Sequence, residues 1–250
     1  MADDGGGSGS ADADHGGGSG YPDADRAEKR PPDGSVADET ASDTPLTDEV
    51  TRRLVHASTS VVPLSYVAFE FVTWRRLQAF LLAAVLGGLC LEAVRLRAGI
   101  DWWVFDKLTR EYEQDNLAGY YLGAVGMAAV ALVFPPAGAD PLVAPADPTP
   151  VAVPAMLMLT VADPVSGLLG SGTLRPTKQT WVLLATFGVA TLLAAPFVPP
   201  TAAVLGGVAA TVADGVKPVV RGYVIDDNLT IPVAAATAMY VAVRYLPALG

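Results

Sequence analysis

The chain has few of the residues that mark most soluble and secreted classes of protein. Its one cysteine, Cys90, excludes a disulfide scaffold and a Cys-x-x-Cys metal site. Basic residues number 16 against 26 acidic ones, and this lack of a basic surplus excludes a nucleic-acid-binding protein. Charged residues make up 17% of the chain, below the roughly one quarter of soluble domains, whereas hydrophobic residues make up 51%. This balance favours a membrane protein.

The charge that is present is concentrated near the amino terminus. Residues 1–50 hold 13 of the 26 acidic and 3 of the 16 basic residues, so the net charge of −10 lies there and the remainder is neutral. Segments such as GGGSGS and PPDG bury too little apolar area to offset the entropy of ordering, and we predict a disordered acidic tail over residues 1–48. No basic stretch leads into an early apolar run, so we expect no signal peptide.

Residues 49–250 are predicted to form an all-α, polytopic membrane helix bundle, because their apolar runs approach the length that crosses a bilayer. Prolines at 196, 199 and 200 divide the uncharged stretch 179–213 into two helices. The expected transmembrane helices are Leu54–Val72, Leu77–Val94, Leu117–Phe134, Val151–Ala162, Trp181–Ala195, Ala202–Ala213 and Ile231–Val243. Several of these seven are short, and six remains the alternative count.

Basic residues predict the orientation of this bundle in the cell membrane. Lys and Arg occur in connections 95–116, 163–178 and 214–228, and are absent from 135–148 and 196–201. The first three connections and the amino terminus are therefore expected in the cytoplasm and the carboxyl end outside. Arg75 and Arg76 are exceptions, since they fall in a connection assigned to the outside.

Four polar clusters gather on the expected cytoplasmic side, where ionisable groups at helix ends usually mark a site or a pore. Arg53 and His56, in the segment TRRLVHAS, share one helical face, although a simple positively charged anchor would look the same. Arg110 and Glu113 precede an apolar run that contains Tyr120 and Tyr121, as a solvated loop before an aromatic belt also would.

The third cluster, ADPVSGLLGSGTLRPTK, combines a carboxylate, glycines and cations. Asp163 ends an apolar run, Gly167, Gly170 and Gly172 follow it, and Arg175 and Lys178 come next. A glycine-rich turn lets backbone N–H groups approach phosphates, while Arg and Lys offset phosphate charge. An ordinary Gly/Pro loop is the alternative.

The fourth cluster surrounds the last expected helix. Asp214 ends one apolar run, and Asp226, Asp227 and Asn228 precede the next. Such residues are common helix caps, but capping alone requires no second acid. Carboxylates can also hold Mg²⁺ that phosphates share. The four clusters therefore suit phosphoryl transfer, in which a protein mainly positions groups and neutralises charge.

In this order the clusters resemble those of the polyprenol kinase group, which comprises dolichol kinase, phytol kinase and CTP-dependent diacylglycerol kinase and is related to phosphatidate cytidylyltransferases. The resemblance covers residues 52–233. Its matching residues are Arg52, Arg53 and His56; Arg110, Glu113, Gly119, Tyr120 and Tyr121; Asp163, Ser166 and Gly170; and Asp214, Asp227, Asn228 and Pro232. The family usually continues with Lys-(Ser/Thr)-x-Glu-Gly, whereas this chain keeps Lys178 and lacks the Glu-Gly pair.

The resemblance implies CTP as phosphate donor and Mg²⁺ as cofactor. Asp163, Asp214, Asp226 and Asp227 are assigned to the metal. Asp163, Asp227, Lys178 and His56 are assigned to catalysis. Gly167, Gly170, Gly172, Arg175, Arg53, Arg110, Glu113 and Asn228 are assigned to the nucleotide.

The leading hypothesis is a membrane kinase that phosphorylates an isoprenoid or glycerolipid alcohol. A cytidylyltransferase that forms a CDP-lipid is the second. A non-catalytic membrane protein or transporter, which the missing Glu-Gly pair favours, is the third.

Overall fold

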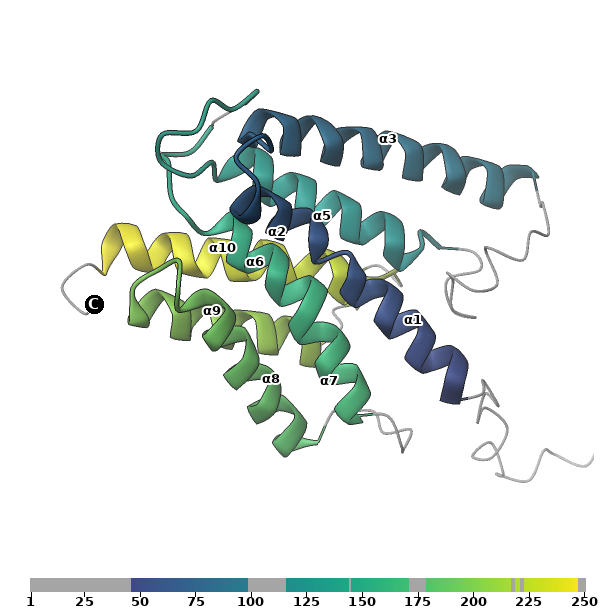
Figure 1. Ribbon diagram of the computed structural model, residues 1–250. Coiled ribbons are helices and arrows are strands. Elements are labelled where there is room, and N and C mark those ends of the chain that lie inside the picture. The colour runs from purple at the N-terminus through teal and green to yellow at the C-terminus, as the bar shows by residue number, and fades with distance from the viewer. Residues whose placement is uncertain are drawn as a thin grey trace, which may run out of the picture. The chain divides into compact units, whose positions relative to one another are not determined.

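A computed structural model describes residues 46–98, 116–143, 145–170, 179–216, 219–220 and 223–246, all of which belong to one compact unit, 42–250. This part of the chain is helical apart from a small hairpin (Figure 1). The helices are α1 (Leu46–Ser58), α2 (Val61–Ala68), α3 (Trp74–Ala98), α5 (Gly119–Val133), α6 (Ala152–Leu157), α7 (Asp163–Gly170), α8 (Thr180–Ala194), α9 (Pro200–Gly215) and α10 (Asp227–Tyr245). The hairpin pairs β1 (Val219–Val220) with β2 (Tyr223–Val224) in antiparallel register.

The first expected membrane helix, Leu54–Val72, is instead two helices with a break at Thr59 and Ser60. The hydroxyl of Thr59 donates to the carbonyl of His56 at 2.5 Å, and such side-chain bonds compete with helical backbone bonding. Pro63 adds to the break, since proline is tolerated in the first turn of a helix and not further along. The prediction of one continuous helix was therefore wrong here.

The other expected helices agree with the structure to within a few residues, except that the fourth is longer. α6 continues through a π-helical segment, Met158–Ala162, directly into α7, so this helix extends to Gly170. α1 begins at Leu46, slightly before the predicted boundary of the domain. Apolar runs therefore located the helices, and local backbone chemistry set where they break or continue.

Small residues on α5, α9 and α10 let these helices pack closely around the centre of the bundle. α10 packs against α9, α5 and α6, and α9 also packs against α8. A Cβ at Gly126 of α5 would lie 2.9 Å from Cγ of Pro232, and one at Gly206 of α9 would lie 2.5 Å from Cγ of Met239. Both contacts require glycine, and they hold α10 between its neighbours.

Of the described helices, two are long and apolar enough to cross a membrane. Trp74–Arg97 has a mean hydropathy of 2.0 and Ala152–Gly170 one of 1.6. The second is largely enclosed by the other helices, whereas the first is mostly exposed.

Candidate metal and phosphate site

Asp163 stands where the π-helical segment passes into α7. Pro164 offers no backbone N–H to the carbonyl of Thr160, four residues earlier, and its ring would clash with that carbonyl in a regular α-helix. The wider π turn over Met158–Ala162 lies where this conflict arises, and such turns are frequent at functional sites. The Asp163 side chain is buried at this point, with the residue 8% exposed.

Two further carboxylates come from the helix ends on either side of the β1–β2 hairpin. Asp214 lies in the last turn of α9 and Asp227 in the first turn of α10, and both are buried. The hydroxyl of Ser166, on α7, donates to Oδ2 of Asp214 at 2.6 Å. This bond ties α7 to the end of α9.

Asp163, Asp214 and Asp227 form a three-carboxylate cluster. One oxygen from each lies within 4.8 Å of the other two. These residues are 8%, 2% and 5% exposed, so water screens their charges poorly. Three ionised carboxylates this close repel one another unless a cation or protons compensate them.

The chemistry of this cluster fits a divalent metal. Mg²⁺ prefers hard oxygen ligands and is commonly bound by a few carboxylates together with substrate phosphates. Asp163, Asp214 and Asp227 come from three separate helices, so each can present one oxygen from a different direction. The residues present therefore suit Mg²⁺.

α1 packs across α7 and brings two positively ionisable side chains to the cluster. Nδ1 of His56 lies 3.9 Å from Oδ2 of Asp163. The guanidinium of Arg53 packs on Gly167, where any Cβ would overlap with Nη1 and Cζ of that arginine. Because Asp163 and Gly167 are one turn apart on α7, as Arg53 and His56 are on α1, the two helices meet face to face. The predicted association of Arg53, His56 and Asp163 is thus present in the structure.

Asp226, also assigned to the metal, lies outside the three-carboxylate cluster. It is the N-cap of α10, and its Oδ1 accepts hydrogen bonds from the backbone N and the side-chain Nδ2 of Asn228, at 2.9 and 2.5 Å. Capping therefore accounts for Asp226, and holding this cap accounts for the Asn228 amide.

Pro232 and Asn228 also contribute to the close packing of α10 against α5. Pro232 has no N–H to give to the carbonyl of Asn228, four residues earlier. A Cβ at Gly126 would lie 3.0 Å from that carbonyl oxygen, so glycine is the residue that allows the close approach. This close packing involves the first turns of α10, where Asp227 also lies.

The segment predicted to be a glycine-rich turn is helical at its start. Gly167 and Gly170 belong to helix α7, which overturns the expectation that they form a phosphate-binding loop. Gly167 instead makes room for Arg53, while a Cβ at Gly170 would meet no atom within 4 Å. Five other predicted residues lie outside the described part of the chain: Arg110, Glu113, Gly172, Arg175 and Lys178.

A second buried polar group, which sequence reasoning missed, joins α3 to the start of α5. Glu92 is 1% exposed and accepts hydrogen bonds from the Arg95 guanidinium at 2.6 Å, from the backbone N of Ala118 at 3.1 Å and from the Tyr120 hydroxyl. Arg95 also donates to the carbonyl of Asn116 at 2.5 Å. The available signal was an acid inside an apolar run with an arginine three residues later. These bonds give the group a structural role, fixing the entry to α5.

No protein-family model, curated protein or solved structure matches this chain.

Proposed function

We propose that the protein is an integral membrane kinase that transfers the γ-phosphate of CTP to a lipid alcohol. The observation that carries the proposal is the convergence of Asp163, Asp214 and Asp227 from three helices beside the cationic face of α1. CTP as the donor comes from the resemblance to polyprenol kinases. An isoprenoid or glycerolipid alcohol is the acceptor class that the same resemblance implies.

A membrane location is supported by apolar side chains on the outer faces of the helices. On α3, Phe80 and Leu86 are 56% and 64% exposed, and on α8, Leu184 and Leu192 are 64% and 73% exposed. Soluble monomers rarely leave extended apolar faces in water. The proposal keeps a polytopic bundle, in which six of the seven expected membrane segments are single helices and the first, Leu54–Val72, is the broken pair α1–α2.

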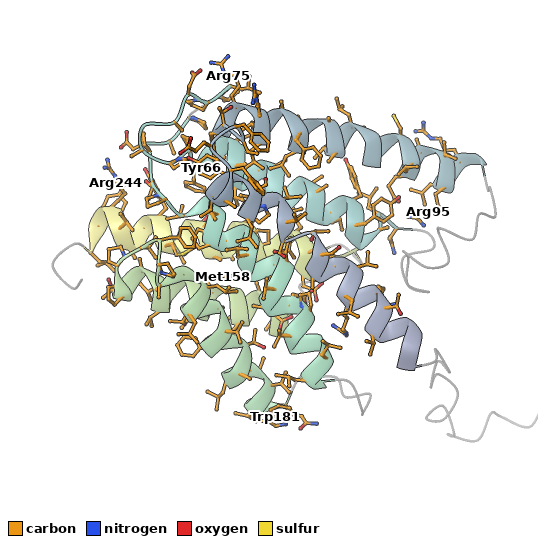
Figure 2. All side chains as sticks on the ribbon, viewed as in Figure 1. Tyr66, Arg75, Arg95, Met158, Trp181 and Arg244 are labelled. Atoms are coloured by element: carbon orange, nitrogen blue, oxygen red, sulfur yellow. The ribbon has the colours of Figure 1, made fainter. Side chains whose placement is uncertain are left out.

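Two ion pairs lie at the end of the bundle that the proposed orientation assigns to the outside. Arg75 donates to Asp140 at 2.7 Å, and Arg244 pairs with Asp147. Figure 2 shows Arg75 and Arg244 at the end of the bundle opposite Arg95. Arg75 and Arg244 therefore remain exceptions to the positive-inside pattern, which counts Lys and Arg and gives acids little weight.

In the proposed reaction, the alcohol oxygen forms a bond to the γ-phosphorus and the bond from that phosphorus to the β,γ-bridging oxygen breaks. The hydroxyl proton passes to a carboxylate of the cluster, and CDP leaves. Bound Mg²⁺ would neutralise phosphate charge. Arg53 is placed to offset further negative charge, and His56 holds Asp163 from the side of α1.

The direct test uses the full chain in lipid nanodiscs with γ-labelled CTP, Mg²⁺ and a panel of lipid alcohols. We expect label in the lipid and release of CDP. Replacing Asp163, Asp214 or Asp227 singly by Asn should lower turnover by about 10²–10³-fold, the usual effect of removing one group that stabilises developing charge.

Asp226→Asn is the matched control, because asparagine is as good an N-cap as aspartate and the residue lies outside the cluster. It should retain turnover within about threefold, whereas loss equal to that of Asp227→Asn would contradict the assignment of the three carboxylates. Release of pyrophosphate together with a CDP-lipid would identify the protein as a cytidylyltransferase instead of a kinase. Absence of CTP binding in the presence of Mg²⁺ would contradict both the kinase and the cytidylyltransferase hypotheses.

A further inference from the structure

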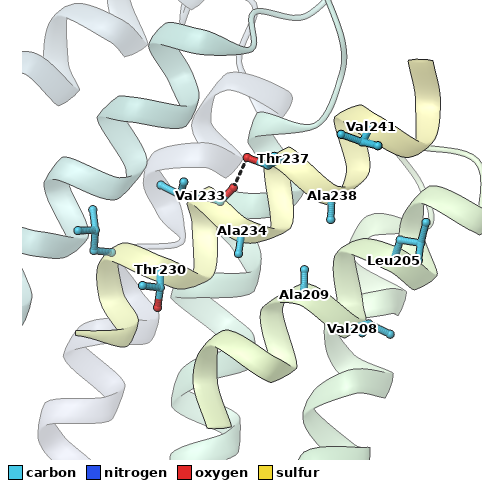
Figure 3. A pocket seen from close by; sticks show the side chains of 10 residues that line it. Leu205, Val208, Ala209, Thr230, Val233, Ala234, Thr237, Ala238 and Val241 are labelled. Atoms are coloured by element: carbon cyan, nitrogen blue, oxygen red, sulfur yellow. Dashed lines mark hydrogen bonds between the residues drawn. The ribbon is translucent and has the colours of Figure 1, made fainter. Parts of the chain in front are cut away.

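An apolar groove runs along the outer side of the α9–α10 pair. It is lined by Leu205, Val208 and Ala209 of α9 and by Val233, Ala238 and Val241 of α10, and its cavity volume is about 790 Å³ (Figure 3). Figure 3 shows Ala234 and Ala238 pointing toward Ala209 across the groove. Alanine on both walls is what leaves this space open.

The two threonines in the groove use their hydroxyls within α10. Thr237 donates its hydroxyl to the carbonyl of Val233 at 2.7 Å, and the Thr230 hydroxyl lies 3.4 Å from the carbonyl of Asp226. Their polar atoms are thereby used within α10. None of the lining residues that the structure describes has an ionisable side chain, so the groove suits a hydrocarbon chain.

One end of the groove lies at the turns of α9 and α10 that follow or carry Asp214 and Asp227. A second cavity, lined partly by Val212, Ala213 and Val216, shares Ala209, Thr230 and Ala234 with the first, so the two form one continuous groove. Ala213 and Val216 flank Asp214 in the sequence.

On α10, Ala234 and Ala238 follow Asp227 by seven and eleven residues, a spacing that returns to the same helical face. Asp227 is therefore the carboxylate in line with the groove. From Thr230 to Val241 the groove follows eleven helical steps, about 16 Å and roughly half the thickness of a bilayer's hydrocarbon core.

We infer that this groove binds the tail of the acceptor, and that the acceptor is a single-chain lipid alcohol whose hydroxyl reaches Asp227. One continuous groove between two helices holds one chain, whereas a diacylglycerol would leave its second chain outside. This inference rests on the proposed function for the identity of the acceptor, but the groove can be tested without phosphoryl transfer.

The test uses a long-chain isoprenoid alcohol with a diazirine at the end of its tail, photolysed with the full chain in nanodiscs in the absence of nucleotide. We expect the label on the α9 and α10 walls, chiefly near Leu205 and Val241. An unlabelled isoprenoid alcohol should compete at a concentration at least tenfold lower than a diacylglycerol or a hydrocarbon of equal length. Label spread evenly over α3 and α8 would identify ordinary surrounding lipid and overturn the inference, as would equal competition by either control lipid.

Ala238→Trp and Ala209→Phe, one on each wall, should each lower this labelling at least fivefold by filling the groove. Ala83→Trp is the matched control, since Ala83 is exposed on α3 and far from the groove in sequence. If the blocking variants label as the control does, the groove is not the site. A cross-link at position 238 between two copies of the protein would show that a second polypeptide covers the groove, and would also overturn the inference. If the wild type is labelled as expected but no phosphate is transferred from CTP, the result would contradict the proposed kinase activity and still support the groove as a binding site for the lipid alcohol.

Discussion

Replacing Gly167 by alanine tests the contact that joins α1 to the site. In α7, alanine should stabilise the helix by about 0.5–1 kcal/mol over glycine. At position 167, however, the new Cβ would overlap with the Arg53 guanidinium, which must move away. Gly170→Ala is the matched control, because it lies in the same helix and its Cβ would meet nothing within 4 Å.

Gly170 is the last residue of α7, so the propensity gain there is at most that at Gly167, and the difference between the variants is a lower bound on the cost of displacing Arg53. Overpacking costs about 1–3 kcal/mol, and we expect Gly167→Ala to be less stable than Gly170→Ala by an amount in this range, toward the lower end because arginine is flexible. The free energy of unfolding can be measured in mixed micelles, and transfer from CTP in nanodiscs. Turnover should fall at least tenfold in Gly167→Ala and stay within about twofold in Gly170→Ala.

The double variant with Arg53→Ala shows whether the difference arises from this contact. With the guanidinium removed, the two alanine variants should agree within about 0.5 kcal/mol, the usual limit for uncoupled changes. Two results would refute the reasoning: equal stability and turnover of Gly167→Ala and Gly170→Ala with Arg53 present, or a difference that survives its removal.

Further substitutions test the packing of α5 and α10. Gly126→Ala should cost about 1–3 kcal/mol because its Cβ would lie 2.9–3.0 Å from α10, whereas Gly123→Ala, with neighbours at 3.8 Å, should be neutral or stabilising; equal effects in unfolding titrations would count against this geometry. Tyr120→Phe should cost about 1.5–3 kcal/mol by removing a hydrogen bond to a buried carboxylate, and Glu92→Gln about 3–5 kcal/mol by leaving the arginine without its ion pair. A smaller loss in Glu92→Gln than in Tyr120→Phe would contradict that order. Asp226→Ala should lose about 1 kcal/mol by removing the α10 cap, and Asp226→Asn close to none.

Much of the fold could be predicted because apolar runs and their boundaries are local properties of the sequence. Prolines between 196 and 200 separate α8 from α9 as expected, and Asp226 begins α10 as a cap. The break after Ser58 was missed because it depends on side-chain hydrogen bonds within an otherwise apolar run. The continuation of α7 through Gly167 was missed because glycine is tolerated in a helix when a neighbour needs the space.

The candidate site could be predicted as a set of residue types but not as a geometry. Nothing local distinguishes Asp226 from Asp227, yet one caps α10 and the other joins the cluster, because the helix begins between them: Asp226 has an extended backbone and its side chain accepts from the backbone N of Asn228, whereas Asp227 is already helical. Glu92 was overlooked because two of its partners, Ala118 and Tyr120, lie more than 25 residues later in the chain, and the sequence does not show that this segment returns to α3. Pairings between distant segments are thus what the sequence alone left open.

The π-helical turn before Asp163 sets the direction in which the residues after it point. A turn closed by i→i+5 bonds accommodates one more residue than an α-helical turn. If Met158–Ala162 were regular α-helix, every later residue of the segment would be rotated by roughly a quarter of a turn relative to α6. Asp163, Ser166 and Gly167 would then all leave their partners together. The rotation of this helix about its own axis, set next to Pro164, therefore determines whether all three contacts form.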